Sequence, residues 1–204
     1  MKKIIVLIIS ILSITAITYS INFFPNPTSM LKVLLNTLNA SIAIIAMKLT
    51  KMKLDIDFKN KKQYVMGLII GVLLSLCIVI IPILLGIQIV GSHLEFNWAI
   101  LINKLLFYML IIGPFEELIF RVYIQDTCIG FFKYNNWVGV ILSSILFGAV
   151  HLINGSLMQM IFATGIGLIF GLCKYNIKDC KYLSLAIAHG IYDFSTIIAR
   201  MFLI

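Results

Sequence analysis

Apolar residues run through this chain in long blocks that short polar segments separate. Each block is close to the roughly 20 residues that an α-helix needs to cross the hydrocarbon core of a bilayer. Backbone N–H and C=O groups in lipid must bond within their own segment, so the blocks are predicted to be helices. The blocks lie at about residues 4–24, 30–47, 64–90, 99–125, 137–153, 157–173 and 182–204.

This pattern predicts an all-α polytopic membrane helix bundle of about seven transmembrane helices. The count becomes eight if Gly113-Pro114 breaks the fourth block in two. The first block follows two lysines, as a signal peptide would, but no Ala-x-Ala cleavage pattern comes after it. We therefore expect a retained first membrane helix.

Composition supports a membrane protein. Of the 204 residues, 61% are hydrophobic and only 12% are charged, whereas a soluble domain is about one quarter charged. Lipid must solvate much of such a chain, so the bilayer is an expected partner. The net charge of +8 could indicate nucleic acid. The basic residues sit in short loops between apolar blocks, however, as membrane anchors do, and we expect no nucleic-acid partner.

The placement of lysines also predicts an orientation. Lys2 and Lys3 precede the first block, the loop at 48–63 is rich in lysine, and the loop at 91–98 has no Lys or Arg. By the positive-inside rule this alternation predicts a cytoplasmic N-terminus in the cell (plasma) membrane. Arg200, near the outer end of the last block, is the exception.

Ionisable groups inside the apolar blocks are the candidate chemistry. A carboxylate at the centre of a lipid-facing helix costs about 2.5 kcal/mol or more. Such groups must therefore face a protein interior or a wet cavity, and pair with one another. Of eight acids and three histidines in the chain, five lie well within blocks: Glu116, Glu117, His151, His189 and Asp193.

The two adjacent glutamates differ in their local partners. Glu117 precedes Arg121 by four residues, the favoured order for an ion pair on one helix face. No Lys or Arg follows Glu116 at that spacing. Pro114 lies just before the pair, which predicts that both carboxylates fall in the first turn of a helix segment, where unsatisfied N–H groups stabilise them.

The other two clusters bring imidazoles. His151 shares a helix face with Phe147, and Gly148 is small enough for a neighbouring helix to approach closely. His189 and Asp193 are four residues apart, so that the acid can orient the ring and set its tautomer. Three apolar blocks thus each supply one polar stripe.

Together these carboxylates and imidazoles could activate a water molecule in either of two ways. Glu116 could act as a general base toward a water that His151 holds. Alternatively Glu116, His151 and His189 could bind a zinc ion that lowers the pKa of bound water. The compact His-Glu-x-x-His zinc motif is absent. The spacing does not choose between the two.

The ordered set Glu116-Glu117-x-x-x-Arg121, Phe147-x-x-x-His151 and His189-x-x-x-Asp193 resembles the CPBP family, the CAAX proteases and bacteriocin-processing enzymes, also called the Abi family. The resemblance covers residues 99–204, which would form the catalytic core. Residues 1–98 are N-terminal transmembrane helices without a motif.

The resemblance implies an integral membrane endopeptidase whose active site lies inside the bilayer. By motif position, Glu116 would be the catalytic glutamate and His151 would help to hold the water. His189 and Asp193 would stabilise the oxyanion on the scissile carbonyl. The expected substrate is a membrane-associated peptide or protein, cut in CAAX-type or in bacteriocin or leader processing.

The resemblance also gives Glu117 and Arg121 a role, namely to fix the helix and tune the catalytic glutamate. Many family members have Asn at the position of Asp193. An ionised Asp cannot donate to an oxyanion, so either Asp193 is protonated or it orients His189, which then donates alone. The family is commonly labelled metalloprotease, and a metal-free glutamate mechanism is also argued for it; zinc therefore stays open.

Two other classes of function compete. A non-catalytic bacteriocin self-immunity or binding protein would shield a membrane target without hydrolysis. A small transporter or proton relay also uses intramembrane Glu and His, but inverted repeats are expected there and none is visible. The sequence does not identify the substrate, the cleaved bond, the metal content or the oligomeric state.

Overall fold

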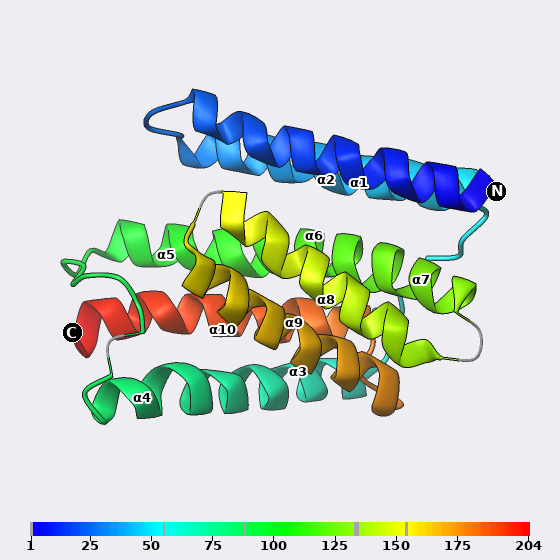
Figure 1. Cartoon of the computed structure of the whole chain (residues 1–204). Coiled ribbons are helices and arrows are strands. Elements are labelled where there is room, and N and C mark those ends of the chain that lie inside the picture. Colours follow the sequence, from blue (N-terminus) through cyan, green and yellow to red (C-terminus); the bar gives the residue numbers. More distant parts are fainter. Residues whose placement is uncertain (1, 55, 88, 133–134, 154) are drawn as a thin grey trace. The chain divides into compact units, whose positions relative to one another are not determined.

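The computed structural model describes residues 2–54, 56–87, 89–132, 135–153 and 155–204 (Figure 1). This part of the chain is 81% helical and contains no strand, which confirms the all-α prediction. Within it, seven helices are long and apolar enough to cross a membrane, so the protein is an integral membrane protein. The seven spans are Lys2–Phe23, Ser29–Leu49, Lys61–Leu84, Trp98–Phe131, Asn136–Ile153, Leu157–Asn176 and Tyr182–Phe202.

Several spans change helix type along their length. Short 3₁₀ or π-helical stretches, labelled η, are inserted between α-helical pieces. The elements are α1 (Lys2–Ser20), η1 (Ile21–Phe23), α2 (Ser29–Leu49), α3 (Lys61–Leu74), η2 (Ser75–Ile80), α4 (Ile81–Leu84), α5 (Trp98–Phe107), η3 (Tyr108–Ile112), α6 (Gly113–Glu117), η4 (Leu118–Gln125), α7 (Asp126–Phe131), α8 (Asn136–Ile153), α9 (Leu157–Asn176) and α10 (Tyr182–Phe202).

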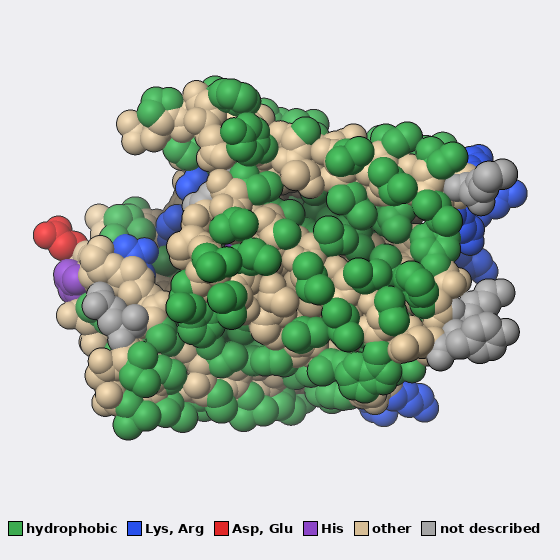
Figure 2. Space-filling model, viewed as in Figure 1, with side chains coloured by type: hydrophobic (Ala, Val, Ile, Leu, Met, Phe, Trp, Pro, Cys, Tyr) green, Lys and Arg blue, Asp and Glu red, His purple; other side chains and the backbone are tan. Residues whose placement is uncertain are grey.

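The chain forms two compact units. The first comprises Met1–Ile56 and Phe115–Lys178, and the second Asp57–Pro114 and Asp179–Ile204. Hydrophobic side chains are spread over the whole visible face, as expected of a surface that lipid solvates (Figure 2). The predicted division of the chain at residue 98 rests on the motifs, because all three lie after it. The two compact units do not test that division, which remains a prediction.

In the first unit, the α1–α2 hairpin packs on η4 and α8, and α8 packs on α9 (Figure 1). Ser10 on α1 shares a 2.6 Å hydrogen bond with the hydroxyl of Tyr123 on η4. The α8–α9 approach depends on Gly148, where a Cβ would lie 2.7 Å from the carbonyl oxygen of Met160. This confirms the predicted use of a small residue for close helix packing.

The fourth span does not break at Pro114. It runs for 34 residues from Trp98 to Phe131. The π-helical turn η3, directly before Gly113, accommodates a proline that lacks an N–H and would clash with a regular preceding turn. The expectation that Glu116 and Glu117 open a new helix segment, with unsatisfied N–H groups, is therefore wrong, because the helix is continuous on both sides of them.

In the second unit, glycines let α10 pack closely. A Cβ on Gly67 of α3 would lie 2.7 Å from the Ser184 carbonyl oxygen, and one on Gly113 would lie 2.5 Å from that of Ala186. The Tyr182 hydroxyl donates to the Pro114 carbonyl oxygen at 3.2 Å. These contacts fix the helix that carries the His189-x-x-x-Asp193 motif.

Candidate functional site

A buried ion pair lies at the start of η4. Arg121 Nε is 3.3 Å from Glu117 Oε2, and both side chains are fully buried, as the spacing predicted. The guanidinium carbon of Arg121 also lies 4.9 Å from the centre of the Phe147 ring on α8. Gly167 on α9 leaves room for this arrangement, since a Cβ there would lie 3.2 Å from Arg121 Nη2. A carboxylate and an aromatic face thus compensate a charge that burial would otherwise destabilise.

Phe147 connects this pair to the imidazole of the second motif. Its ring lies 4.7 Å from that of His151 and makes an edge contact with Phe120 at 5.1 Å. His151 Nδ1 is 2.9 Å from the carbonyl oxygen of Phe147. A carbonyl oxygen only accepts hydrogen bonds, so Nδ1 carries the proton. Nε2 of the neutral ring is therefore the acceptor that His151 offers to a ligand.

A cavity of about 230 Å³ within the first unit brings Glu116 and His151 together. Glu116 is half-buried, as is His151. The hairpin forms one side of the cavity through polar and apolar side chains of α1 and α2. The residues that line it are Ile14, Thr18, Ile21, Lys32, Leu35, Asn36, Asn39, Glu116, Ile119, Phe120, Val150, His151, Gly155 and Gln159.

The third motif lies on α10 in the second unit. His189 is 3% exposed, and its Nε2 lies 3.5 Å from Asp193 Oδ2, so the acid contacts the ring as expected from the spacing. The prediction that this motif shares one cavity with Glu116 and His151 concerns both units and stays a prediction.

Sequence reasoning missed the polar side chains that the hairpin supplies. Lys32, Asn36 and Asn39 line the cavity together with Thr18 of α1. A signal for them exists, because positions 32, 36 and 39 are spaced i, i+4, i+7 and so occupy one face of an otherwise apolar helix. The α2 block contains a polar stripe like those of the three motifs.

The zinc site that the sequence left open, with Glu116, His151 and His189 as ligands, draws on both units and stays a prediction. Catalytic zinc takes three protein ligands and a water. The cavity offers Glu116 and His151, and within either unit no three His, Cys, Asp or Glu side chains of the described residues are placed to hold a metal ion.

These observations define a class of protein: an integral membrane helix bundle with a buried acid–base pair beside a cavity that presents a carboxylate and an imidazole acceptor. Residues 96–195 match the family model described as type II CAAX prenyl endopeptidase Rce1-like. This match confirms the resemblance to the CAAX protease family that the three motifs predicted. Comparisons with curated proteins and with solved structures gave no match.

Proposed function

We propose that this protein is an intramembrane endopeptidase that hydrolyses a peptide bond of a membrane-associated protein or peptide, with Glu116 as the general base. The observation that carries the proposal is the shared cavity of Glu116 and His151, in a chain whose residues 96–195 match the family model of CAAX prenyl endopeptidases. The cavity has room for several waters or for part of a peptide.

The tautomer of His151 determines how the water is held. Glu116 and His151 Nε2 are both acceptors, so one water can donate one hydrogen to each. Its lone pairs then point away from both groups, toward a substrate carbonyl carbon. As the C–O bond forms, Glu116 takes the proton, and it returns that proton to the amide nitrogen as the C–N bond breaks. General acid–base catalysis of this kind contributes about 10²–10⁴-fold.

The remaining motif residues support this step. The buried Glu117–Arg121 pair fixes Phe147, whose ring and carbonyl position His151. Asp193 Oδ2 lies 3.5 Å from His189 Nε2 and orients that ring, which stabilises the oxyanion on the scissile carbonyl. Asp193 in this role is the orienting acid, so it need not itself be protonated.

The test is cleavage by purified protein in liposomes. The probe is a fluorescent peptide ending in a prenylated cysteine, two aliphatic residues and a free C-terminal residue. Glu116→Gln is expected to lose at least about 100-fold in kcat, whereas Glu95→Gln, in an exposed loop, keeps wild-type activity. Hydrolysis in H₂¹⁸O should label the new carboxyl terminus. Undiminished cleavage by Glu116→Gln rejects the role assigned to this residue.

A second variant of this residue, Glu116→Ala, separates hydrolysis from the competing function of bacteriocin self-immunity. If the protein protects cells by binding alone, protection survives Glu116→Ala as long as the protein still inserts. If it acts by cleaving a bacteriocin or leader peptide, protection is lost. Loss of protection would also indicate the substrate class, because it would mean that protection depends on cleavage of a bacteriocin or leader peptide.

For location we propose the plasma membrane with a cytoplasmic N-terminus. In the α1–α2 hairpin, Lys2 and Lys3 at the start of α1 and Lys48 at the end of α2 lie at the same end. Such a basic end faces the cytoplasm by the positive-inside rule. A reporter that works only outside the cytoplasm should be active when it is fused at the loop of residues 24–28. A reporter that works only in the cytoplasm should be inactive there.

A further inference from the structure

We propose that α2 forms a substrate subsite of the cavity, in which Asn39 accepts a hydrogen bond from a substrate N–H and Lys32 binds a substrate carboxylate. This inference rests on the proposed function and names residues that determine its specificity. Both residues lie outside the segment 96–195 that the family model matches.

The orientation of the Asn39 amide follows from its neighbour. Thr18 donates its hydroxyl hydrogen to the Ile14 carbonyl oxygen at 2.9 Å, so Thr18 Oγ1 can only accept from another group. The Asn39 atom that lies 3.1 Å from it is therefore the nitrogen, Nδ2. The amide oxygen is consequently directed to a different partner.

That oxygen has no partner among the described residues. Asn39 is 6% exposed and lines the cavity, and no donor of the described chain reaches its Oδ1. A buried acceptor without a hydrogen bond is costly and calls for a donor. In an endopeptidase the donor that arrives with every substrate is a backbone N–H.

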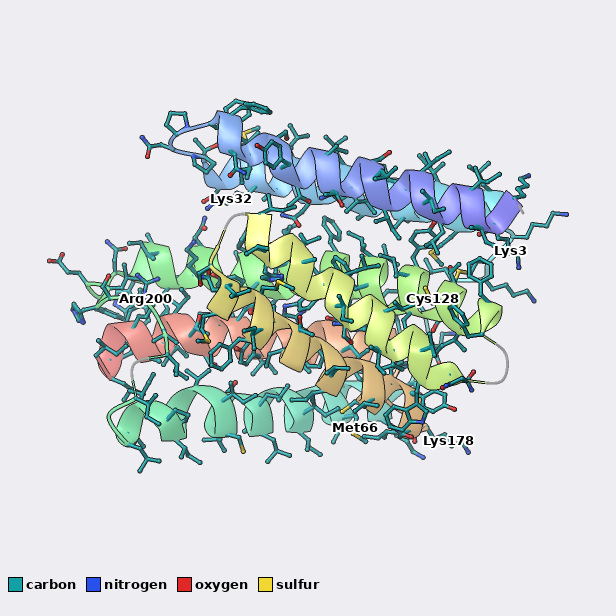
Figure 3. All side chains as sticks on the ribbon, in the orientation of Figure 1. Lys3, Lys32, Met66, Cys128, Lys178 and Arg200 are labelled. Atoms are coloured by element: carbon teal, nitrogen blue, oxygen red, sulfur yellow. The ribbon has the colours of Figure 1, made fainter. Side chains whose placement is uncertain are left out.

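Lys32 supplies the second element of the subsite. It is half-buried near the start of α2, at the opposite end of the hairpin from Lys2 and Lys3 (Figure 3). Within the described part of the chain no carboxylate forms an ion pair with it. A cation so placed is suited to an anion that the ligand brings.

The spacing of the two residues limits where that anion can be. Lys32 and Asn39 are seven residues apart, so about 10.5 Å along the helix axis at 1.5 Å per residue. An extended peptide covers this distance in about three residues, at roughly 3.3 Å each. The substrate carboxylate therefore lies about three residues from the N–H that Asn39 binds, either as the chain terminus or as an acidic side chain.

Binding to the Glu116→Gln protein tests this without any need for hydrolysis. Three prenylated probe peptides are compared by fluorescence anisotropy: one with a free C-terminus, one with a C-terminal amide, and one amidated peptide with Glu as its last residue. Lys32→Met is expected to weaken the carboxylate peptide that the subsite recognises by about tenfold or more, and to leave the neutral amide unchanged. The peptide that responds identifies the source of the carboxylate.

Lys3→Met, at the far end of the hairpin, is the matched control and should bind all three peptides as before. Equal affinities of Lys32→Met and its parent for every peptide would overturn the role of Lys32. Since binding is measured with a cleavage-deficient protein, a failed hydrolysis assay and a failed subsite remain separate results.

Asn39 is tested by removing the N–H from the ligand. An ester in place of one amide within the last four residues should weaken binding about five- to tenfold at the position that faces Asn39. In Asn39→Leu the same ester should cost nothing, because the acceptor is gone. Ester peptides that bind the unaltered Asn39 protein as well as the amides do would refute the hydrogen bond, whatever the folding of the variant.

Discussion

The guanidinium carbon of Arg121 lies 4.9 Å from the centre of the Phe147 ring. The centre of the same ring lies 4.7 Å from the centre of the His151 imidazole. Phe147 therefore links the first motif to the second, through a residue with no titratable group. The imidazole on the cavity is thus held by an aromatic side chain that packs between two polar ones.

Replacing Phe147 with Leu removes the aromatic contacts to Arg121 and His151 while keeping an apolar side chain. We expect kcat to fall about tenfold or more, since loss of catalytic geometry is a transition-state effect, and KM to change little. Phe162→Leu, whose ring is exposed at 47% on α9, is the control. A rise in KM with unchanged kcat would show that Phe147 acts on substrate binding instead.

The buried Glu117–Arg121 pair predicts a non-additive loss of stability. Glu117→Gln or Arg121→Met alone leaves an uncompensated buried charge, which costs about 3–5 kcal/mol. The double variant removes both charges and should unfold at a higher temperature than either single variant, which thermal unfolding in detergent measures. Additive losses would mean that the two side chains do not depend on each other.

The close packing at Gly148 predicts that a larger side chain there lowers the stability of the protein. A Cβ there would lie 2.7 Å from the Met160 carbonyl oxygen, whereas one on Gly165 would meet nothing within 4 Å. Gly148→Ala should therefore destabilise the protein by about 1–3 kcal/mol, and Gly165→Ala should be neutral or mildly stabilising. Equal melting temperatures for the two variants would mean that α8 and α9 are not in close contact.

The proposed mechanism, with Glu116 as the general base, predicts activity without a bound metal. Purified protein should contain far less than one zinc per chain by elemental analysis, and a chelator should leave cleavage of the prenylated probe unchanged. One metal ion per chain, together with activity that a chelator abolishes and zinc restores, would replace the glutamate mechanism by a metal-assisted one. Glu116→Gln serves as the reference for full loss of activity.

Local spacing in the sequence was enough to predict several features of this protein. Apolar blocks of about 20 residues predicted the seven spans of the described chain, because lipid requires each segment to satisfy its own backbone. The contacts between Glu117 and Arg121 and between His189 and Asp193 also followed from the sequence, since residues four apart on a helix meet whatever surrounds them.

Only the tertiary structure decided how distant segments combine. The sequence could not show that the helix continues through Pro114, because this depends on a π-helical turn that surrounding packing supports. Nor could it place Lys32 and Asn39 on the cavity of Glu116 and His151. A helical period shows which residues share a face, but the neighbour of that face is chosen by the packing of side chains from helices far apart in the chain.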